Sequence, residues 1–123
     1  MITEDYVSFE VAKLLKDKGF DEGCRAHYGG DGSFSYEKYE VEASGCEMHN
    51  AILAPTLQMT MKWLREMYNI YIVITPSMFW GKYNVSIYKK GNIYPYGFDG
   101  DSLISSYEKA VENAIKYCLE NLI

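Results

Sequence analysis

Apolar residues recur at helical spacing in three segments of the chain. The first segment, residues 8–18, places apolar side chains on one side and charged ones on the other: Val11, Ala12, Leu14 and Leu15 against Lys13, Lys16 and Asp17. This period of about 3.6 residues predicts an amphipathic helix. Gly19 is well placed to end that helix in a left-handed conformation.

Two further helices are predicted downstream. The second begins at Pro55, since proline suits the first helical position, and it ends near Asn69. Its apolar face is wide, with one stripe at Leu57, Met61, Leu64 and Tyr68 and a second at Met59, Trp63 and Met67. The last helix follows a capping box of Ser105 and Glu108. Its apolar face comprises Tyr107, Val111, Ala114, Ile115, Cys118 and Leu122.

Three segments between these two helices read as strands. Residues 70–76, "IYIVITP", are short and β-branched, which predicts a buried strand. Residues 82–90 alternate between apolar and polar positions, and "KKGN" predicts a hairpin turn in which Gly91 and Asn92 adopt positive φ. Residues 93–98 contain Pro95, which cannot donate to a ladder, so this strand belongs at a sheet edge. Together they predict an antiparallel meander.

Residues 21–54 have the weakest periodicity in the chain. The turn signal "GGDG" at 29–32 and the loosely alternating "SYEKYEVE" predict an irregular β-hairpin there. The predicted fold is therefore α+β, with three helices packed on a three-stranded antiparallel meander and an irregular N-terminal hairpin. At 123 residues, we expect one domain over residues 1–123.

The charge of the chain disfavours nucleic acid as a partner. The formal net charge is −5; residues 1–50 hold eleven acidic and five basic residues, and residues 51–123 hold six and seven. The order helix, three strands, helix from Pro55 onward is also that of double-stranded-RNA-binding domains. Those domains need a basic cluster at the start of the last helix, where this chain has "SLISSYEKAVENA".

A reduced, cytoplasmic location is expected, with no membrane contact. The first ten residues, "MITEDYVSFE", lack the basic start and apolar core of a signal peptide, and the apolar run "IYIVI" is too short to cross a bilayer. The three cysteines do not have the spacing of a small disulfide-stabilised protein.

Three stretches carry a resemblance to known sequences: "MITEDYVSFEVAKLLKDKGFDE", "APTLQMTMKWLRE" and "SYEKAVENAIKYCLENLI". They resemble short uncharacterised proteins of gut bacteria and their phages or mobile elements. The similarity spans most of the chain and is weakest at 25–50 and 76–100. It implies a cytoplasmic, phage-related accessory protein, and it brings no known activity, ligand or site residue.

A doubled Gly-Cys-x-x-His is the chain's one candidate metal motif. Cys24 and His27 form the first pair, and Cys46 and His49 form the second, with eighteen residues between the pairs. Four such ligands could hold zinc in a tetrahedron. However, common zinc spacings begin with Cys-x-x-Cys, and the apolar stripes already supply a core. The alternative is that the cysteines are small half-buried residues and the histidines are surface groups.

Aromatic residues gather on or beside the predicted meander and favour a contact surface. The candidate surface comprises Phe79, Trp80, Tyr88, Tyr94 and Tyr96. Exposed Tyr and Trp are typical of protein interfaces, although cross-strand tyrosines also simply stabilise sheets. No convergent catalytic set is visible. We therefore expect a non-enzymatic interaction or accessory protein without a cofactor, which binds a protein partner or itself; the alternative is a small zinc-stabilised binding module.

Overall fold

The computed structural model describes residues 2–48, 50–78, 81–96 and 106–123, and at 47–48 and 92–96 it describes the backbone. Contacts divide the chain into two compact units, Met1–Leu57 and Gln58–Ile123. The described residues form four helices and two three-stranded antiparallel sheets. The predicted α+β class is confirmed; the structure adds a fourth helix, and the predicted N-terminal hairpin is part of a second three-stranded sheet. The expectation of a single domain stays a prediction.

The first unit contains two helices and three strands. They are α1 (Phe9–Asp17), β1 (Cys24–Gly29), β2 (Phe34–Val41), α2 (Ala43–Met48) and β3 (Ala51–Leu53). The helix α1 begins as predicted, because the Ser8 hydroxyl accepts a hydrogen bond from the Val11 backbone N–H (3.2 Å). Its buried side chains are Val11, Ala12 and Leu15, and Gly19 has a positive φ of 90° just after its C-cap.

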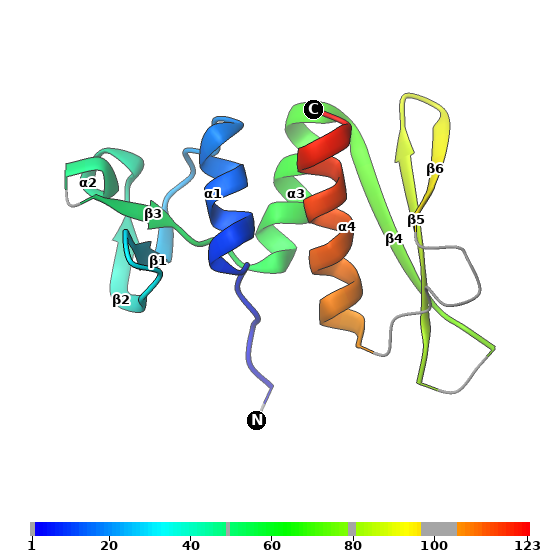
Figure 1. Cartoon of the computed structure of the whole chain (residues 1–123), viewed down its shortest axis with the longest axis horizontal. Helices are drawn as coiled ribbons and strands as arrows, with labels where there is room; N and C mark the ends of the chain where they lie inside the picture. Colours follow the sequence, from blue (N-terminus) through cyan, green and yellow to red (C-terminus); the bar gives the residue numbers. More distant parts are fainter. Residues whose placement is uncertain (1, 49, 79–80, 97–105) are drawn as a thin grey trace. The chain divides into compact units, whose positions relative to one another are not determined.

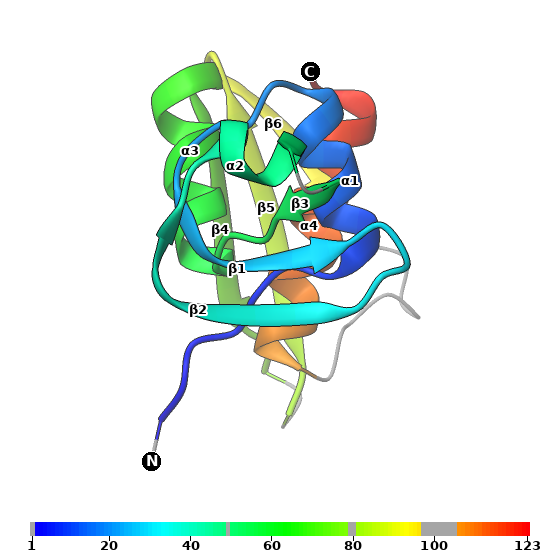
Figure 2. The same ribbon diagram turned by 90° about the vertical axis from the view of Figure 1, so that its left-hand side faces the viewer.

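The sheet of the first unit has the order β2-β1-β3 (Figure 2). The pair β1–β2 is the irregular hairpin that the sequence predicts, since its register shifts between Cys24↔Val41 and Ala26↔Tyr36. The strand β3 pairs antiparallel with the other side of β1. The helix α2 and the strand β3 were not predicted, because both are short and neither shows an apolar period.

The second unit is a meander with two helices on one side of it. Its elements are α3 (Leu57–Tyr68, with its first residue in the first unit), β4 (Ile70–Pro76), β5 (Tyr83–Lys89), β6 (Asn92–Tyr96) and α4 (Tyr107–Asn121). The sheet order β4-β5-β6 follows the chain, as predicted. Figure 1 shows α3 and α4 on the same side of this sheet, and α4 packs on β4 and β5.

The core of the second unit joins one sheet face to α4. Val85 and Ile87 alternate as buried residues along β5, and Ile70 is buried at the start of β4. The helix α4 contributes Ala110, Val111, Ala114, Ile115, Cys118 and Leu119, all buried. Leu119 therefore completes the apolar face; Leu122, which the sequence predicted, is the half-buried C-cap.

Several local predictions in the second unit are wrong. The helix α3 begins at Leu57 and not at Pro55, whose carbonyl accepts a hydrogen bond from Val7 N–H. Its second predicted stripe is not buried throughout, since Met59 and Met67 are exposed while Thr60 is fully buried. The strand β4 is buried on one face alone, because Tyr71 and Val73 are exposed.

Two predicted turn and cap positions are shifted by one residue. The β5–β6 turn places positive φ on Lys90 and Gly91, whereas Asn92 is the first residue of β6 and pairs with Lys89. The helix α4 is capped by Ser106, whose hydroxyl accepts from Lys109 N–H (3.3 Å). Ser105, the predicted cap, lies outside the described residues. The cap error arises because Ser105 and Ser106 have the same capping preference, and local propensity does not choose between them.

Candidate functional site

The structure places the predicted metal ligands on β1 and α2. Cys24 and Cys46 are both buried, at 5% and 4% exposure, and they lie close enough that Cys46 helps to raise the pKa of Cys24. His27 lies on β1 with its Nε2 atom 4.0 Å from the Glu37 carboxylate. His49 lies outside the described residues. Among the described residues, no group of three His, Cys, Asp or Glu side chains could hold a metal ion.

The cysteine environments disfavour thiolate chemistry. Burial raises the pKa of Cys24 to about 12 and that of Cys118 to about 12. Burial also raises the pKa of Cys46, although the nearby Lys16 ammonium opposes this rise. A thiol must lose its proton to act as a nucleophile or a metal ligand. All three thiols are therefore protonated near neutral pH, and Cys118 is a core residue of α4 as its sequence pattern indicates.

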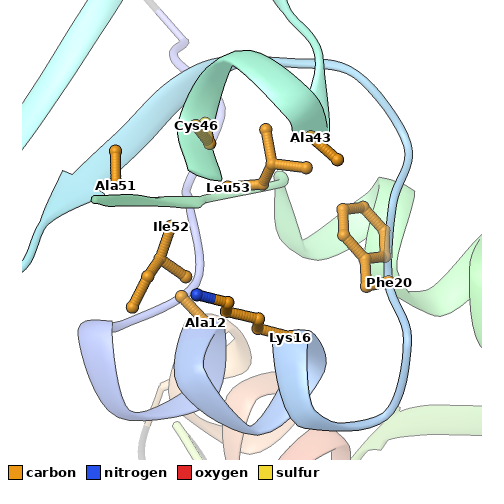
Figure 3. Close-up of a pocket in the computed structure, with 8 residues that line it drawn as sticks. All are labelled: Ala12, Lys16, Phe20, Ala43, Cys46, Ala51, Ile52 and Leu53. Carbon is orange, nitrogen blue, oxygen red and sulfur yellow. The ribbon is translucent and has the colours of Figure 1, made fainter. Parts of the chain in front are cut away.

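A hollow in the first unit brings together residues that the sequence did not connect. Its empty space is ≈ 320 Å³, including open solvent, and its lining comprises Ala12, Lys16, Phe20, Ala43, Cys46, Ala51, Ile52 and Leu53. Figure 3 shows α1 and α2 on opposite sides of β3, with Ile52 pointing toward Ala12 and Leu53 toward α2. Lys16 is the charged residue of this lining. Ala12 and Lys16 are one turn apart on α1, a spacing that marks a common face.

The outer edge of β3 borders this hollow. The Ala54 N–H donates to the Ala26 carbonyl (3.0 Å), and the β1–β3 register continues with Tyr28 opposite Ile52. Alternate residues of an antiparallel strand bond to the same neighbour, so the backbone groups of Ile52 point toward β1. Those of Ala51 and Leu53 point to the other edge, where no described strand pairs with them.

The sheet face of the second unit that is turned away from α4 carries two exposed tyrosines. Tyr71 and Tyr88 are directly paired across β4 and β5 and are 49% and 38% exposed. Val73 lies two residues along β4 on the same face and is 40% exposed. We call these three residues the outer sheet face. Tyr88, which the sequence selected, belongs to it; Tyr71 and Val73 were missed because "IYIVITP" reads as a strand buried on both faces.

Of the other predicted contact residues, the structure describes Tyr94 and Tyr96, and these by their backbone alone. Phe79 and Trp80 lie outside the described residues. Tyr94 and Tyr96 pair by backbone register with Ile87 and Val85, the two buried positions of β5. Tyr88 instead pairs with Ile93. The three predicted strand tyrosines therefore do not occupy equivalent register positions.

The first unit holds an aromatic cluster that the sequence analysis did not find. Tyr28 has its ring centroid 5.4 Å from that of Phe34 and 5.5 Å from that of Phe9 on α1. Tyr6 lies 5.5 Å from Phe34 and 6.1 Å from Tyr36. The Tyr28 hydroxyl donates to the Val7 carbonyl (2.6 Å). These contacts join the chain's start to the β1–β2 pair, which indicates a structural role for this cluster.

Comparisons with protein-family models, with curated proteins and with solved structures find no match to this chain. No helix in the described part of the chain has the length and apolar character needed to span a membrane.

Proposed function

We propose that this chain is a non-enzymatic interaction protein, and that the outer sheet face of Tyr71, Val73 and Tyr88 is its contact surface. The observation that carries the proposal is the pairing of two exposed tyrosines on a sheet whose other face is buried under α4. Tyrosine is a rigid, amphipathic side chain that is enriched in interfaces because it loses little entropy on binding.

The charges around this face favour a protein partner with an acidic rim. The neighbouring outer positions Thr75, Asn84 and Ser86 are uncharged, while Lys82 and Lys90 flank the two ends of β5 and are exposed. Neutral centres with a charged border are typical of non-obligate interfaces. Two lysines and a net charge of −5 do not provide the electrostatic attraction that nucleic acid requires.

The experiment compares how well the full chain and two double variants capture a protein partner. Tyr71→Ser/Tyr88→Ser removes the two tyrosines of the outer sheet face, and Tyr39→Ser/Met67→Ser removes two exposed side chains outside it as a control. A partner that is retained by the wild-type chain and the control, and lost with the sheet variant, is then purified. Its binding should weaken at least tenfold in the sheet variant and decline with added salt. Equal binding by all three proteins would show that the surface is wrong.

The proposed location is the cytoplasm, in the role of a phage-related accessory protein that the resemblance implies. The three free cysteines support this location, since thiols persist in reducing compartments. The zinc-stabilised module remains the alternative proposal, supported by the proximity of Cys24 and Cys46. This alternative predicts that native mass spectrometry detects one zinc ion per chain, and that the Cys24→Ser variant has lost this ion.

A further inference from the structure

We propose that the hollow beside β3 binds the extended C-terminal end of a partner polypeptide, which adds a strand to the sheet β2-β1-β3. We call this hollow with the outer edge of β3 the β3 groove. It lies in the first unit and goes beyond the contact surface proposed above, because neither site contains residues of the other.

The strand β3 has backbone groups on its outer edge with which no described strand pairs. The N–H and C=O groups of Ala51 and Leu53 point away from β1, and no described strand pairs with these two residues. Further along the same edge the chain is already paired, since the Pro55 carbonyl accepts from Val7 N–H. Exposed strand edges bind extended peptides through their main chain, with specificity supplied by pockets for alternate side chains. The groove offers such a pocket, walled by Ala12 and Ile52 on one side and by Ala43 on the other (Figure 3).

Lys16 gives the groove a charge that a carboxylate complements. The lining of the groove is apolar apart from this ammonium, and Figure 3 shows the Lys16 side chain extending across the α1 side of the groove. A single cation beside apolar walls is suited to a ligand that combines an apolar side chain with one carboxylate. The first unit already holds eleven acidic and five basic residues, so a ligand with several acidic side chains would be repelled.

The short length of β3 limits how much of a partner chain can pair with it. β3 has three residues, and two of them present backbone groups to the edge. An occupant therefore needs to be extended over a short distance only, and a chain end can satisfy both the backbone groups and Lys16. This selects a C-terminal carboxylate over an internal acidic segment, which would have to leave the groove again within a few residues.

The test uses three fluorescein-labelled hexapeptides that end in Val, Leu or Phe, each prepared with a free carboxylate and as a C-terminal amide. Each is titrated into the ¹⁵N-labelled full chain. At least one free-acid peptide should shift the backbone amide signals of Ala51 and Leu53 and give saturable anisotropy. Its amide form should bind at least tenfold more weakly, because the charge-assisted contact to Lys16 is lost.

Variants separate the groove from nonspecific attraction. Lys16→Met keeps the aliphatic stem and should weaken the free-acid peptide about tenfold while leaving the amide peptide unchanged. Lys62→Met removes an exposed lysine of α3, outside the groove, and should change neither. Ala43→Phe fills the groove from α2 and should abolish binding, with the spectrum of the free protein showing that it remains folded.

Three outcomes would overturn the proposal. The first is that none of the peptides moves the Ala51 and Leu53 signals at millimolar concentration. The second is that acid and amide forms bind equally, which would remove the role of Lys16. The third is that Lys62→Met weakens binding as much as Lys16→Met, since the attraction would then be general. None of these results bears on the outer sheet face, whose variants are assayed separately.

Discussion

The sheet β4-β5-β6 and the sheet β2-β1-β3 both contain three antiparallel strands, but their residues specify them differently. In the sheet β4-β5-β6, seven consecutive residue pairs join β4 to β5 without a break, and β5 alternates buried Val85 and Ile87 with more exposed neighbours. In the sheet β2-β1-β3, the register shifts within β1–β2, and β2 is exposed along nearly its whole length. Regular alternation therefore fixes the register of β5 through burial. The strand β2 is held instead by its pairing with β1 and by the ring contacts of Phe34 and Tyr36.

The largest expected effect tests this contrast directly. Ile87→Ala in β5 removes a fully buried side chain and should lower the free energy of unfolding by about 2–5 kcal/mol, because the cavity cannot fully collapse. Tyr39→Ala in β2 removes a side chain that is 74% exposed and should cost less than about 0.5 kcal/mol. Urea denaturation measures both. Comparable losses would mean that β2 is anchored as firmly as β5, and the contrast would fail.

A second prediction concerns how one buried thiol from each unit, Cys24 and Cys118, makes the free energy of unfolding depend on pH. Cys24 and Cys118 have pKa values of about 12 in the folded chain, against 9.0 for an unperturbed thiol. Above pH 9 the unfolded chain therefore loses protons that the folded chain keeps, so stability falls as pH rises through 9 toward 12. Each thiol contributes a slope of at most about 1.4 kcal/mol per pH unit.

Denaturation at pH 7.5, 9 and 10 checks this slope. Cys24→Ala and Cys118→Ala should each flatten the fall between pH 9 and 10, whereas Cys46→Ala should flatten it less, since Lys16 opposes the rise of its pKa. The thiols of Cys24 and Cys118 should also react with iodoacetamide more slowly than that of Cys46 at pH 8. An unchanged slope in all three variants would show that the thiols are solvated alike in both states.

The second unit could be predicted in detail because its determinants are local. β-branched residues and alternation set the strands at 70–76 and 83–89, and a glycine turn joins the second of them to β6, all within one stretch of sequence. The predicted boundaries differ from the structure by a residue or two. Its exposed face was missed at Tyr71 because an unbroken apolar run is compatible with burial on one face or on two.

In the first unit, α1 and the irregular β1–β2 hairpin were predicted, but α2, β3 and the groove were not, because their determinants are not local. The strand β3 has three residues and pairs with a strand more than twenty positions earlier, so it is too short for an alternating apolar pattern to predict it. Lys16 reads from the sequence as an outer residue of an amphipathic helix, and the structure indeed exposes it. Its role at the groove depends on α2 and β3 meeting beside α1. The proximity of Cys24 and Cys46 likewise follows from the pairing of β1 with β3, which brings α2 near β1. The spacing of the two Cys-x-x-His pairs in the sequence was compatible with a metal site but did not establish this proximity.

Two glycines should respond in opposite directions to the same substitution. Gly91 has a φ of 81° in the β5–β6 turn, so Gly91→Ala should cost about 1 kcal/mol in free energy of unfolding. Gly45 lies in α2 without positive φ, and an added Cβ would lie 3.7 Å from Val41, an ordinary contact. Gly45→Ala should therefore stabilise by about 0.5–1 kcal/mol. Destabilisation by Gly45→Ala would show that α2 is held by something other than helix propensity.

The last comparison is between the two serines that begin the helices α1 and α4. Ser8 Oγ accepts from Val11 N–H at 3.2 Å and Ser106 Oγ from Lys109 N–H at 3.3 Å, so each caps one otherwise unpaired donor. Ser8→Ala and Ser106→Ala should each cost about 1 kcal/mol, while Ser105→Ala should stay within about 0.5 kcal/mol. Thermal and urea unfolding measure these differences. A larger loss for Ser105→Ala than for Ser106→Ala would show that Ser105 is the cap, as the sequence pattern predicts, and that the first turn of α4 begins one residue earlier.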